Sequence, residues 1–262
     1  MAQNTVKDAM VLCGLDDDDS ETIASEIFLD DFQSVMDISE TELTDSFKTL
    51  SGLTQAQGQL RVLPAQKNKI KAFIQWVRDM IRTGIDPASR TFPVDEAAGL
   101  LRRAKTHKLY MDKSDTISSA AKPEKFSQDL NWEDWAPSFA NYLRAIPGRN
   151  GVPLKYVIRK EEEPDSTPHP DFIDDYVAMA PLNGPAFTSD AAEVHTFLLN
   201  FIAGNTEAES IVKVHQERNG RDEWLALQVH YEGEGIYAHD ITKAENDLAT
   251  LYYSGERKPH MW

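Results

Sequence analysis

The sequence predicts an all-α protein. Apolar residues recur at three- and four-residue intervals along most of the chain, and strand-type alternation of apolar and polar residues is nowhere sustained. Glycine, proline and typical N-cap residues bound the periodic segments. A length of 262 residues allows two domains. We therefore expect a five-helix bundle over residues 1–85, a basic helix and polar linker over 86–129, and a helical domain over 130–262.

The first 85 residues predict four short helices and a long fifth one. Val6, Met10 and Cys13 share one side of the first helix, and Ser20 is the expected N-cap of the second. The fifth helix begins near Pro64, a favoured first-turn residue, and Gly84 ends it. Its apolar stripe has helical spacing and consists of Ile70, Phe73, Ile74, Val77, Met80 and Ile81.

Two stretches of this region are similar to a known helical family. DISETELTDSF (Asp37–Phe47) resembles the entry to the middle helix of a sterile alpha motif (SAM) domain, and LPAQKNKIKAFIQWV (Leu63–Val77) resembles its final helix. The Gly-His pair that usually begins that final helix is absent, so the expectation is a divergent SAM-like bundle. The resemblance implies association with proteins, or with RNA.

Residues 94–111 predict a basic helix, and the polar, Ser/Ala-rich stretch Asp112–Asp129 predicts a linker. Beyond it, Asn131 is the expected cap of a helix in which Pro137 kinks or detaches the first turn. The apolar face of that helix is Trp132, Trp135, Phe139, Tyr142 and Leu143. Aromatic residues at helical spacing form a core far more often than a ligand site.

A second helix of the C-terminal domain ends at Gly204, and a capping box from Thr206 to Glu209 is expected to open the next one. The apolar positions of the second helix are Val194, Phe197, Leu198, Phe201 and Ile202. Further helical segments follow the Asn219-Gly220 turn and Gly235. The C-terminal domain is therefore predicted to be helical to its end.

Four stretches lie within the region from about residue 126 to residue 262: WEDWAPSFANYLRAIPGRNGVPLKYVIR, HTFLLNFIAGNTEAESIV, GRDEWLALQVHYEG and AENDLATLYYSGERKPHMW. Together they resemble the Gag polypeptide of copia-type long-terminal-repeat retrotransposons, with Trp224, Leu227 and Tyr231 in a Trp-x-x-Leu-x-x-x-Tyr-like segment. The resemblance implies a capsid-like, self-assembling protein that packages the element's RNA. The Cys/His zinc knuckle of that family requires more than one cysteine, and Cys13 stands alone. The chain reads as part of a longer polyprotein, or as a degenerate copy.

The sequence predicts no enzyme, cofactor or metal site. It contains no G-x-S-x-G, Walker A, H-E-x-x-H or G-x-G-x-x-G motif, and its seven histidines are scattered. Phe172–Asp175 matches the aromatic-x-Asp-Asp signature of reverse transcriptases by chance, because no strand pattern surrounds it. The first residues lack a signal-peptide pattern, and no apolar run is long enough to cross a membrane. We expect a cytoplasmic or nuclear protein.

Charge is distributed unevenly along the chain, whose net charge is −16. Residues 1–60 carry two basic and 13 acidic residues, whereas residues 61–113 carry 12 basic and five acidic ones. This polarity suits head-to-tail self-association or attraction of a charged partner, and two solvated surfaces are the plain alternative. A weak nucleic-acid or self-association surface is expected at Lys67, Lys69, Lys71, Arg102 and Arg103.

The sequence is therefore consistent with two functions. The first is a Gag-like structural protein that forms homo-oligomers and binds RNA weakly and without sequence preference in this part of the chain. The second is a SAM-like adaptor that tethers partners in signalling or gene regulation. A zinc knuckle or pol-like sequence in the same reading frame favours the first, and specific partners without particles favour the second.

Overall fold

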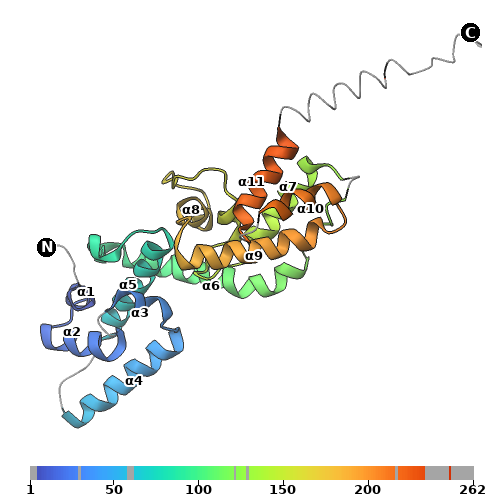
Figure 1. Cartoon of the computed structure of the whole chain (residues 1–262). Coiled ribbons are helices and arrows are strands. Elements are labelled where there is room, and N and C mark those ends of the chain that lie inside the picture. The colour runs from blue at the N-terminus through green and yellow to red at the C-terminus, as the bar shows by residue number, and fades with distance from the viewer. Residues whose placement is uncertain are drawn as a thin grey trace, which may run out of the picture. The chain divides into compact units, whose positions relative to one another are not determined.

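The computed structural model describes residues 5–28, 31–57, 62–120, 122–127, 130–215, 218–233 and 248. In this part of the chain every regular element is a helix (Figure 1). One isolated antiparallel bridge joins Pro147 to Pro153. The predicted all-α class is confirmed. Most of the segment expected to be helical after Gly235 lies outside the described residues.

The helices follow one another with short connections. The first group is α1 (Val6–Leu12), α2 (Asp17–Ile23) with a π-helical turn (Ala24–Phe28), α3 (Phe32–Asp37), α4 (Glu40–Gln57), α5 (Pro64–Arg82), two 3₁₀ turns (Pro87–Ser89 and Val94–Glu96) and α6 (Ala97–Ala120). The second group is α7 (Trp132–Ala145), a 3₁₀ turn (Leu154–Ile158), α8 (Phe172–Met179), α9 (Gly184–Ile202), α10 (Thr206–Val214) and α11 (Gly220–Glu232).

The chain forms two compact units. Unit 1 comprises Met1–Lys122 and Asn141–Asp190, and unit 2 comprises Pro123–Ala140 and Ala191–Trp262. This division differs from the expected boundary near residue 130, because residues 141–190 belong with the N-terminal helices. Specific polar contacts explain the difference: Arg82 Nε donates to the carbonyl oxygen of Asn150 over 2.9 Å, and the Tyr176 hydroxyl donates to Asp79 Oδ1 over 2.5 Å.

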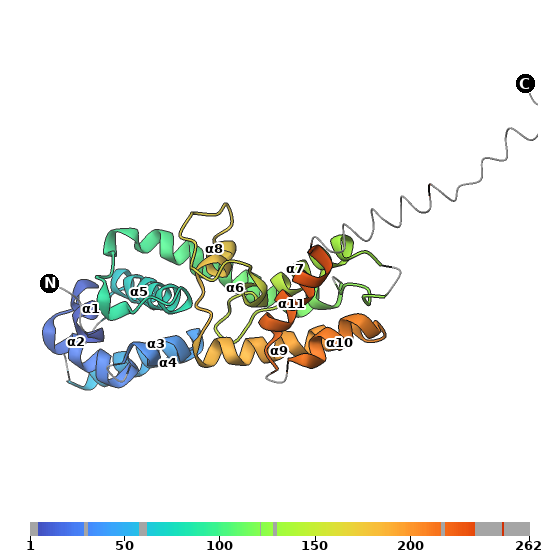
Figure 2. The same cartoon turned by 45° about the horizontal axis from the view of Figure 1, so that its top comes forward.

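Helix α5 is the centre of unit 1 and packs against α3, α6 and α8 (Figure 2). The expected stripe is buried from Ile70 to Met80, and Ile81 is half-buried. The rings of Phe73 and Phe92 meet edge-on with centroids 5.6 Å apart. The opposite side of α5 is also covered, however, because Gln75, Asp79 and Arg82 are buried as well. The amphipathic pattern correctly predicts the apolar face, but α5 is enclosed on more than one side.

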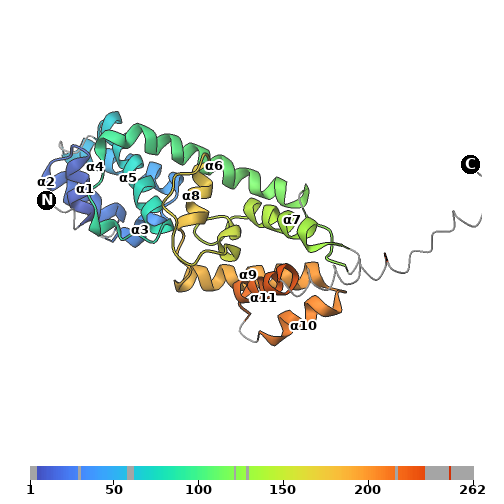
Figure 3. The same ribbon diagram turned by 90° about the horizontal axis from the view of Figure 1, so that it is seen from above.

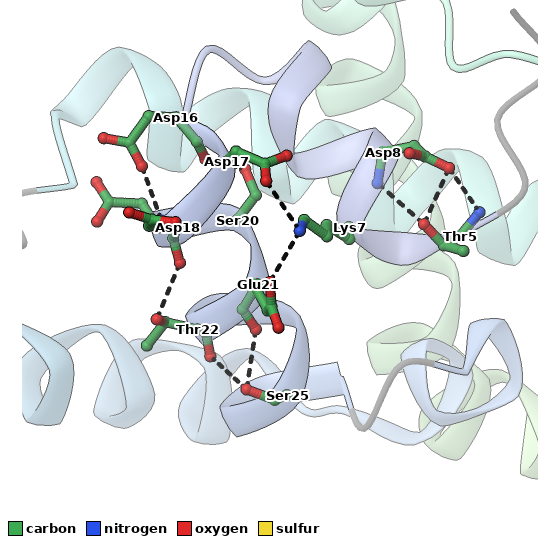
Figure 4. Close-up of polar contacts among 11 residues, drawn as sticks. Thr5, Lys7, Asp8, Asp16, Asp17, Asp18, Ser20, Glu21, Thr22 and Ser25 are labelled. Atoms are coloured by element: carbon green, nitrogen blue, oxygen red, sulfur yellow. Dashed lines mark hydrogen bonds and ion pairs between the residues drawn. The ribbon is translucent and has the colours of Figure 1, made fainter.

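The N-terminal helices are fixed by local caps (Figure 4). Thr5 and Asp8 form a capping box at the start of α1, and Lys7 pairs with Asp17 and Glu21 of α2. The expected cap at Ser20 is wrong. Asp16 is the N-cap of α2 and accepts from the Asp19 backbone N–H, while Ser20 lies inside the helix and its hydroxyl donates to the Asp16 carbonyl. A carboxylate four residues earlier competes better for the free N–H groups of the first turn.

The predicted basic helix is present, but it is longer than expected. A 3₁₀ turn at Val94–Glu96 leads into α6, which continues to Ala120. The expected linker Asp112–Asp129 is therefore wrong over its first nine residues. Serine and alanine are tolerated in helices when an existing helix only has to be extended, because extension costs far less than nucleation.

Unit 2 has an aromatic core, as the helical spacing predicts. Trp132, Trp135, Phe139 and Trp224 are buried, and the ring centroids of Phe139 and Trp224 are 5.4 Å apart. Phe201 meets Phe139 edge-on at 5.9 Å, but its side chain is only half-buried. Phe197, expected in the core as well, is also half-buried, while Val194, Leu198 and Ile202 carry the buried face of α9.

Asparagine side chains begin the last helices (Figure 3 shows α9, α10 and α11). Asn205, and not Thr206, caps α10 by accepting from the Ala208 backbone N–H, so the expected capping box from Thr206 to Glu209 is wrong. The Asn219-Gly220 pair is the start of α11, where Asn219 accepts from the Arg221 backbone N–H. Pro137 lies inside the continuous helix α7, so its first turn is not a separate element.

Candidate cationic groove in unit 1

The five basic residues expected to form one surface differ in their contacts and in their burial. The Lys67 ammonium lies 5.3 Å from the centroid of the Phe47 ring, and Lys71 Nζ lies 3.8 Å from Glu40 Oε1. Arg103 Nη1 is 3.8 Å from Asp79 Oδ2, and Arg102 is exposed on α6. Lys69 is half-buried. Three of the five side chains thus contact other groups of unit 1, and the single basic surface stays a prediction.

A different set of cations shares one concave site. A groove of about 660 Å³ lies between the α3–α4 connection, α5 and α6. Five cationic side chains and one carboxylate line it: Lys71, Arg78, Arg82, Lys105, Lys108 and Glu40. Of the five residues predicted from sequence, only Lys71 belongs to this groove.

Two arginines at the base of the groove are held by backbone carbonyls. Arg78 Nη2 donates to the carbonyl oxygen of Ile38 and, over 3.4 Å, to that of Met36. Burial lowers the pKa of Arg78, with the neighbouring charge of Arg82 as a further cause. The two hydrogen bonds join the α3–α4 connection to α5. They hold the guanidinium in place but do not neutralise its charge.

Arg82 is the most enclosed cation of the groove, with 7% of its side chain exposed. Its Nε donates to Asn150, and its guanidinium carbon lies 5.4 Å from the centroid of the Tyr176 ring. Its Nη1 has no hydrogen-bond partner among the described residues, although Asp79 Oδ1 lies 3.5 Å away at ion-pair distance. We regard that contact as electrostatic, because 3.5 Å is long for a charged hydrogen bond.

Asp79 is a buried carboxylate behind Arg82. Its Oδ1 accepts from the Tyr176 hydroxyl over 2.5 Å and from Gln75 Nε2 over 2.6 Å, while its Oδ2 has no hydrogen bond in the described part of the chain. Burial raises the pKa of Asp79, and the bonds from Tyr176 and the charge of Arg82 oppose that rise. The carboxylate therefore offsets the charge of Arg82 only in part.

His107 lines the groove as a neutral side chain. Burial, together with the charge of Arg82, lowers the pKa of His107 to about 4. Because a carbonyl oxygen only accepts, His107 Nε2 carries the hydrogen that it donates to Gly151 over 2.9 Å. Gly151 has a φ of +70°, and a Cβ there would lie 2.9 Å from the His107 ring, so the close approach requires glycine.

Glu40 already occupies part of the groove. Its Oε2 accepts from Lys108 Nζ over 3.1 Å, and its Oε1 faces Lys71. These contacts, the bond from Lys108 first, lower the pKa of Glu40. The carboxylate is thus an internal anion placed between cations of α5 and α6.

Helical spacing contains a signal for most of the groove. On α5, Lys71, Gln75, Arg78 and Arg82 follow one another at intervals of four, three and four residues, which places them on one face. Polar residues outside the apolar stripe of a helix are ordinarily expected to face solvent. Only the packing of α6 and of residues 141–190 shows that they face a shared cavity.

The other polar sites are structural in geometry. In unit 2, His195 Nδ1 lies 2.6 Å from Oε1 of Glu223, a carboxylate that is fully buried. Burial raises the pKa of Glu223, and the contact with His195 opposes that rise. In unit 1, Asp174 pairs with Arg144 at 2.8 Å from within α8, so the Phe172–Asp175 fragment lies on a helix and not on the hairpin of a polymerase.

Within the described ranges no group of three or more His, Cys, Asp or Glu side chains is arranged to hold a metal ion. None of the helices described is both long and apolar enough to cross a bilayer. A scan of protein-family models, a search of curated proteins and a search of solved structures found no match to this chain.

Proposed function

We propose that this chain is a non-enzymatic structural protein that associates with further copies of itself, in the manner of the copia-type Gag polypeptides that residues 126–262 resemble. The quoted stretches supply most of the buried aromatic side chains of unit 2, among them Trp132, Trp135 and Trp224. The resemblance therefore falls on residues that build a packed helical unit.

The observation that carries the proposal is the separation of charge within unit 1. Asp16, Asp17 and Asp18 are exposed at the start of α2, and Lys7 is the cation that pairs there, with Asp17 and Glu21. On α6, Arg102 and Lys105 are exposed, and no ion-pair partner for either lies among the described residues. A cationic face and an anionic face on one unit allow the α6 of one copy to contact the α2 of the next.

Such a contact joins two different surfaces, so it continues from copy to copy and favours rings or open chains over a closed dimer. Leu109, which is 56% exposed, shares the α6 face with Arg102 and Lys105 at helical spacing and adds apolar area to it. Each exposed ion pair stabilises the contact by only about 0–1 kcal/mol. We therefore expect weak association that strengthens with concentration and weakens with salt.

RNA binding by this chain is proposed to be weak and independent of sequence, because the net charge of −16 opposes contact with phosphates. Any binding should fall steeply as salt rises, since neutralised phosphates release their counterions. Tight binding to one RNA sequence that persists in high salt contradicts this part of the proposal.

The test is light scattering of the full chain over a range of concentrations at low and high salt. The average mass should increase with concentration at low salt and fall towards the monomer at high salt. The double variant Arg102→Glu, Lys105→Glu should abolish the increase. We avoid reversing Lys67 and Lys71, because their contacts with Phe47 and Glu40 lie inside the unit.

The matched control is Lys122→Glu, Lys125→Glu, which changes the net charge equally at two exposed positions beyond the C-terminal end of α6. This control should associate like the parent chain. A chain that stays monomeric at high concentration and low salt contradicts the proposal, and specific capture of another protein by that monomer would favour the SAM-like adaptor instead.

A further inference from the structure

We propose that the cationic groove between the α3–α4 connection, α5 and α6 binds a compact polyphosphate anion. The inference does not depend on self-association, because the groove is complete within one unit 1. It rests on the convergence of five cationic side chains from two helices on a cavity of about 660 Å³, which is a usual size for a small-molecule site.

The depth of the cations favours a small ligand that enters the groove. Arg82 is more than nine-tenths buried at its base, where its Nε donates to Asn150 and its Nη1 lies at ion-pair distance from Asp79. Arg78 is half-buried beside it, whereas Lys105 and Lys108 are exposed at the rim. A compact anion reaches both levels, while the backbone of a long polyanion would contact only the rim.

The rest of the lining combines hydrogen-bonding side chains with apolar ones and with the ring of His107. Asn68, Ser39 and Gln75 add hydrogen-bonding groups, and no Phe, Tyr or Trp is among the residues that line the groove. Sequence-tolerant binding of single-stranded nucleic acid depends on aromatic side chains on which bases stack. Because the one ring of the lining, His107, is buried and bonded to Gly151, the groove favours multiple phosphates over a stacked base.

Glu40 shows how an anion is accommodated. Its carboxylate lies between Lys108, at 3.1 Å, and Lys71, at 3.8 Å, and it is the only carboxylate of the described lining. A ligand with several negative charges would displace it and take over both lysines. Glu40 is thus an internal competitor, and its charge should weaken the binding of the ligand.

The test is isothermal titration calorimetry of the full chain with inorganic tripolyphosphate in metal-free buffer at low salt. Binding should occur and should weaken as salt rises. Lys71→Ala should weaken it by about fivefold, and Glu40→Gln should strengthen it by about fivefold, since one partly exposed charge pair is lost in each case. Opposite effects of two neighbouring substitutions separate a site from a general loss of structure.

Arg102→Ala is the matched control, because Arg102 is an exposed cation of α6 that does not line the groove. It should leave tripolyphosphate binding unchanged. Absence of binding at low salt overturns the proposal, and so does equal weakening by Arg102→Ala and Lys71→Ala. Single-stranded RNA could also compete with tripolyphosphate for the parent chain. If the RNA displaces tripolyphosphate and binds more tightly than tripolyphosphate does, the groove is a nucleic-acid site and the proposal fails.

Discussion

Replacing Tyr176 by phenylalanine tests the hydrogen bond that joins α8 to α5. The change removes the hydroxyl that donates to Asp79 Oδ1 over 2.5 Å, across 97 positions of sequence. It keeps the ring, which meets Phe172 edge-on at 5.5 Å and lies 5.4 Å from the Arg82 guanidinium carbon. The measured effect therefore reports the hydroxyl and not the packing.

The expected cost follows from what Asp79 retains. Gln75 still donates to Oδ1 over 2.6 Å, but Oδ2 has no hydrogen bond among the described residues, so the carboxyl loses one of its two hydrogen-bond donors there. A hydrogen bond to a charged group contributes about 1.5–3 kcal/mol. Burial raises the pKa of Asp79 and so disfavours its charged form, which places the expected effect near the lower end of that range. We expect the free energy of unfolding to fall by about 2 kcal/mol.

Tyr110→Phe is the matched control in the same unit. The Tyr110 hydroxyl donates to the neutral carbonyl oxygen of Arg144 over 3.1 Å, so its loss should cost about 0.5–1.5 kcal/mol. Urea unfolding of the full chain, followed by circular dichroism, measures both variants against the parent. If Tyr176→Phe costs no more than Tyr110→Phe, the buried carboxylate does not stabilise unit 1 in the way described here.

Two further predictions follow from the packing and from the buried carboxylate. Gly220→Ala should lower the free energy of unfolding by about 1–3 kcal/mol, since a Cβ would lie 2.6 Å from the backbone nitrogen of His195. Its control is Gly99→Ala, which should not destabilise the chain because a Cβ there meets nothing closer than 3.9 Å. Equal urea midpoints for the two variants would contradict the close packing at Gly220. Because the folded state raises the pKa of Asp79 above its ordinary 3.8, this carboxyl should stabilise the fold fully below that pH and lose stability as pH rises through the folded-state pKa. Asp79→Asn should remove this downward slope from unfolding curves measured between acidic and neutral pH, and parallel slopes would show that the carboxyl ionises freely.

Local patterns were enough to predict the helical class and several core faces. The stripe from Ile70 to Met80 and the aromatic face from Trp132 to Leu143 are buried as their spacing requires. Both predictions depend on a helix having 3.6 residues per turn, which is a property of the backbone and needs no tertiary contact. Cap positions were less predictable, because neighbouring side chains can each serve as a cap: Asp16 caps α2 in place of Ser20, and Asn205 caps α10 in place of Thr206.

The cationic groove was decided by tertiary structure. The spacing of Lys71, Arg78 and Arg82 places them on one face of α5, but a repeat in sequence does not say whether that face meets water, another helix or a cavity. Asn150 binds Arg82 across 68 positions, and such a partner leaves no trace in the local pattern. From sequence, a charged residue is expected to face water, because burying a charge is favourable only when other groups compensate for the lost water. In a folded chain, a distant segment can supply those groups. The sequence by itself therefore determined which helices form and which faces are apolar, while the packing of distant segments decided which charges are buried, paired or left facing a shared site.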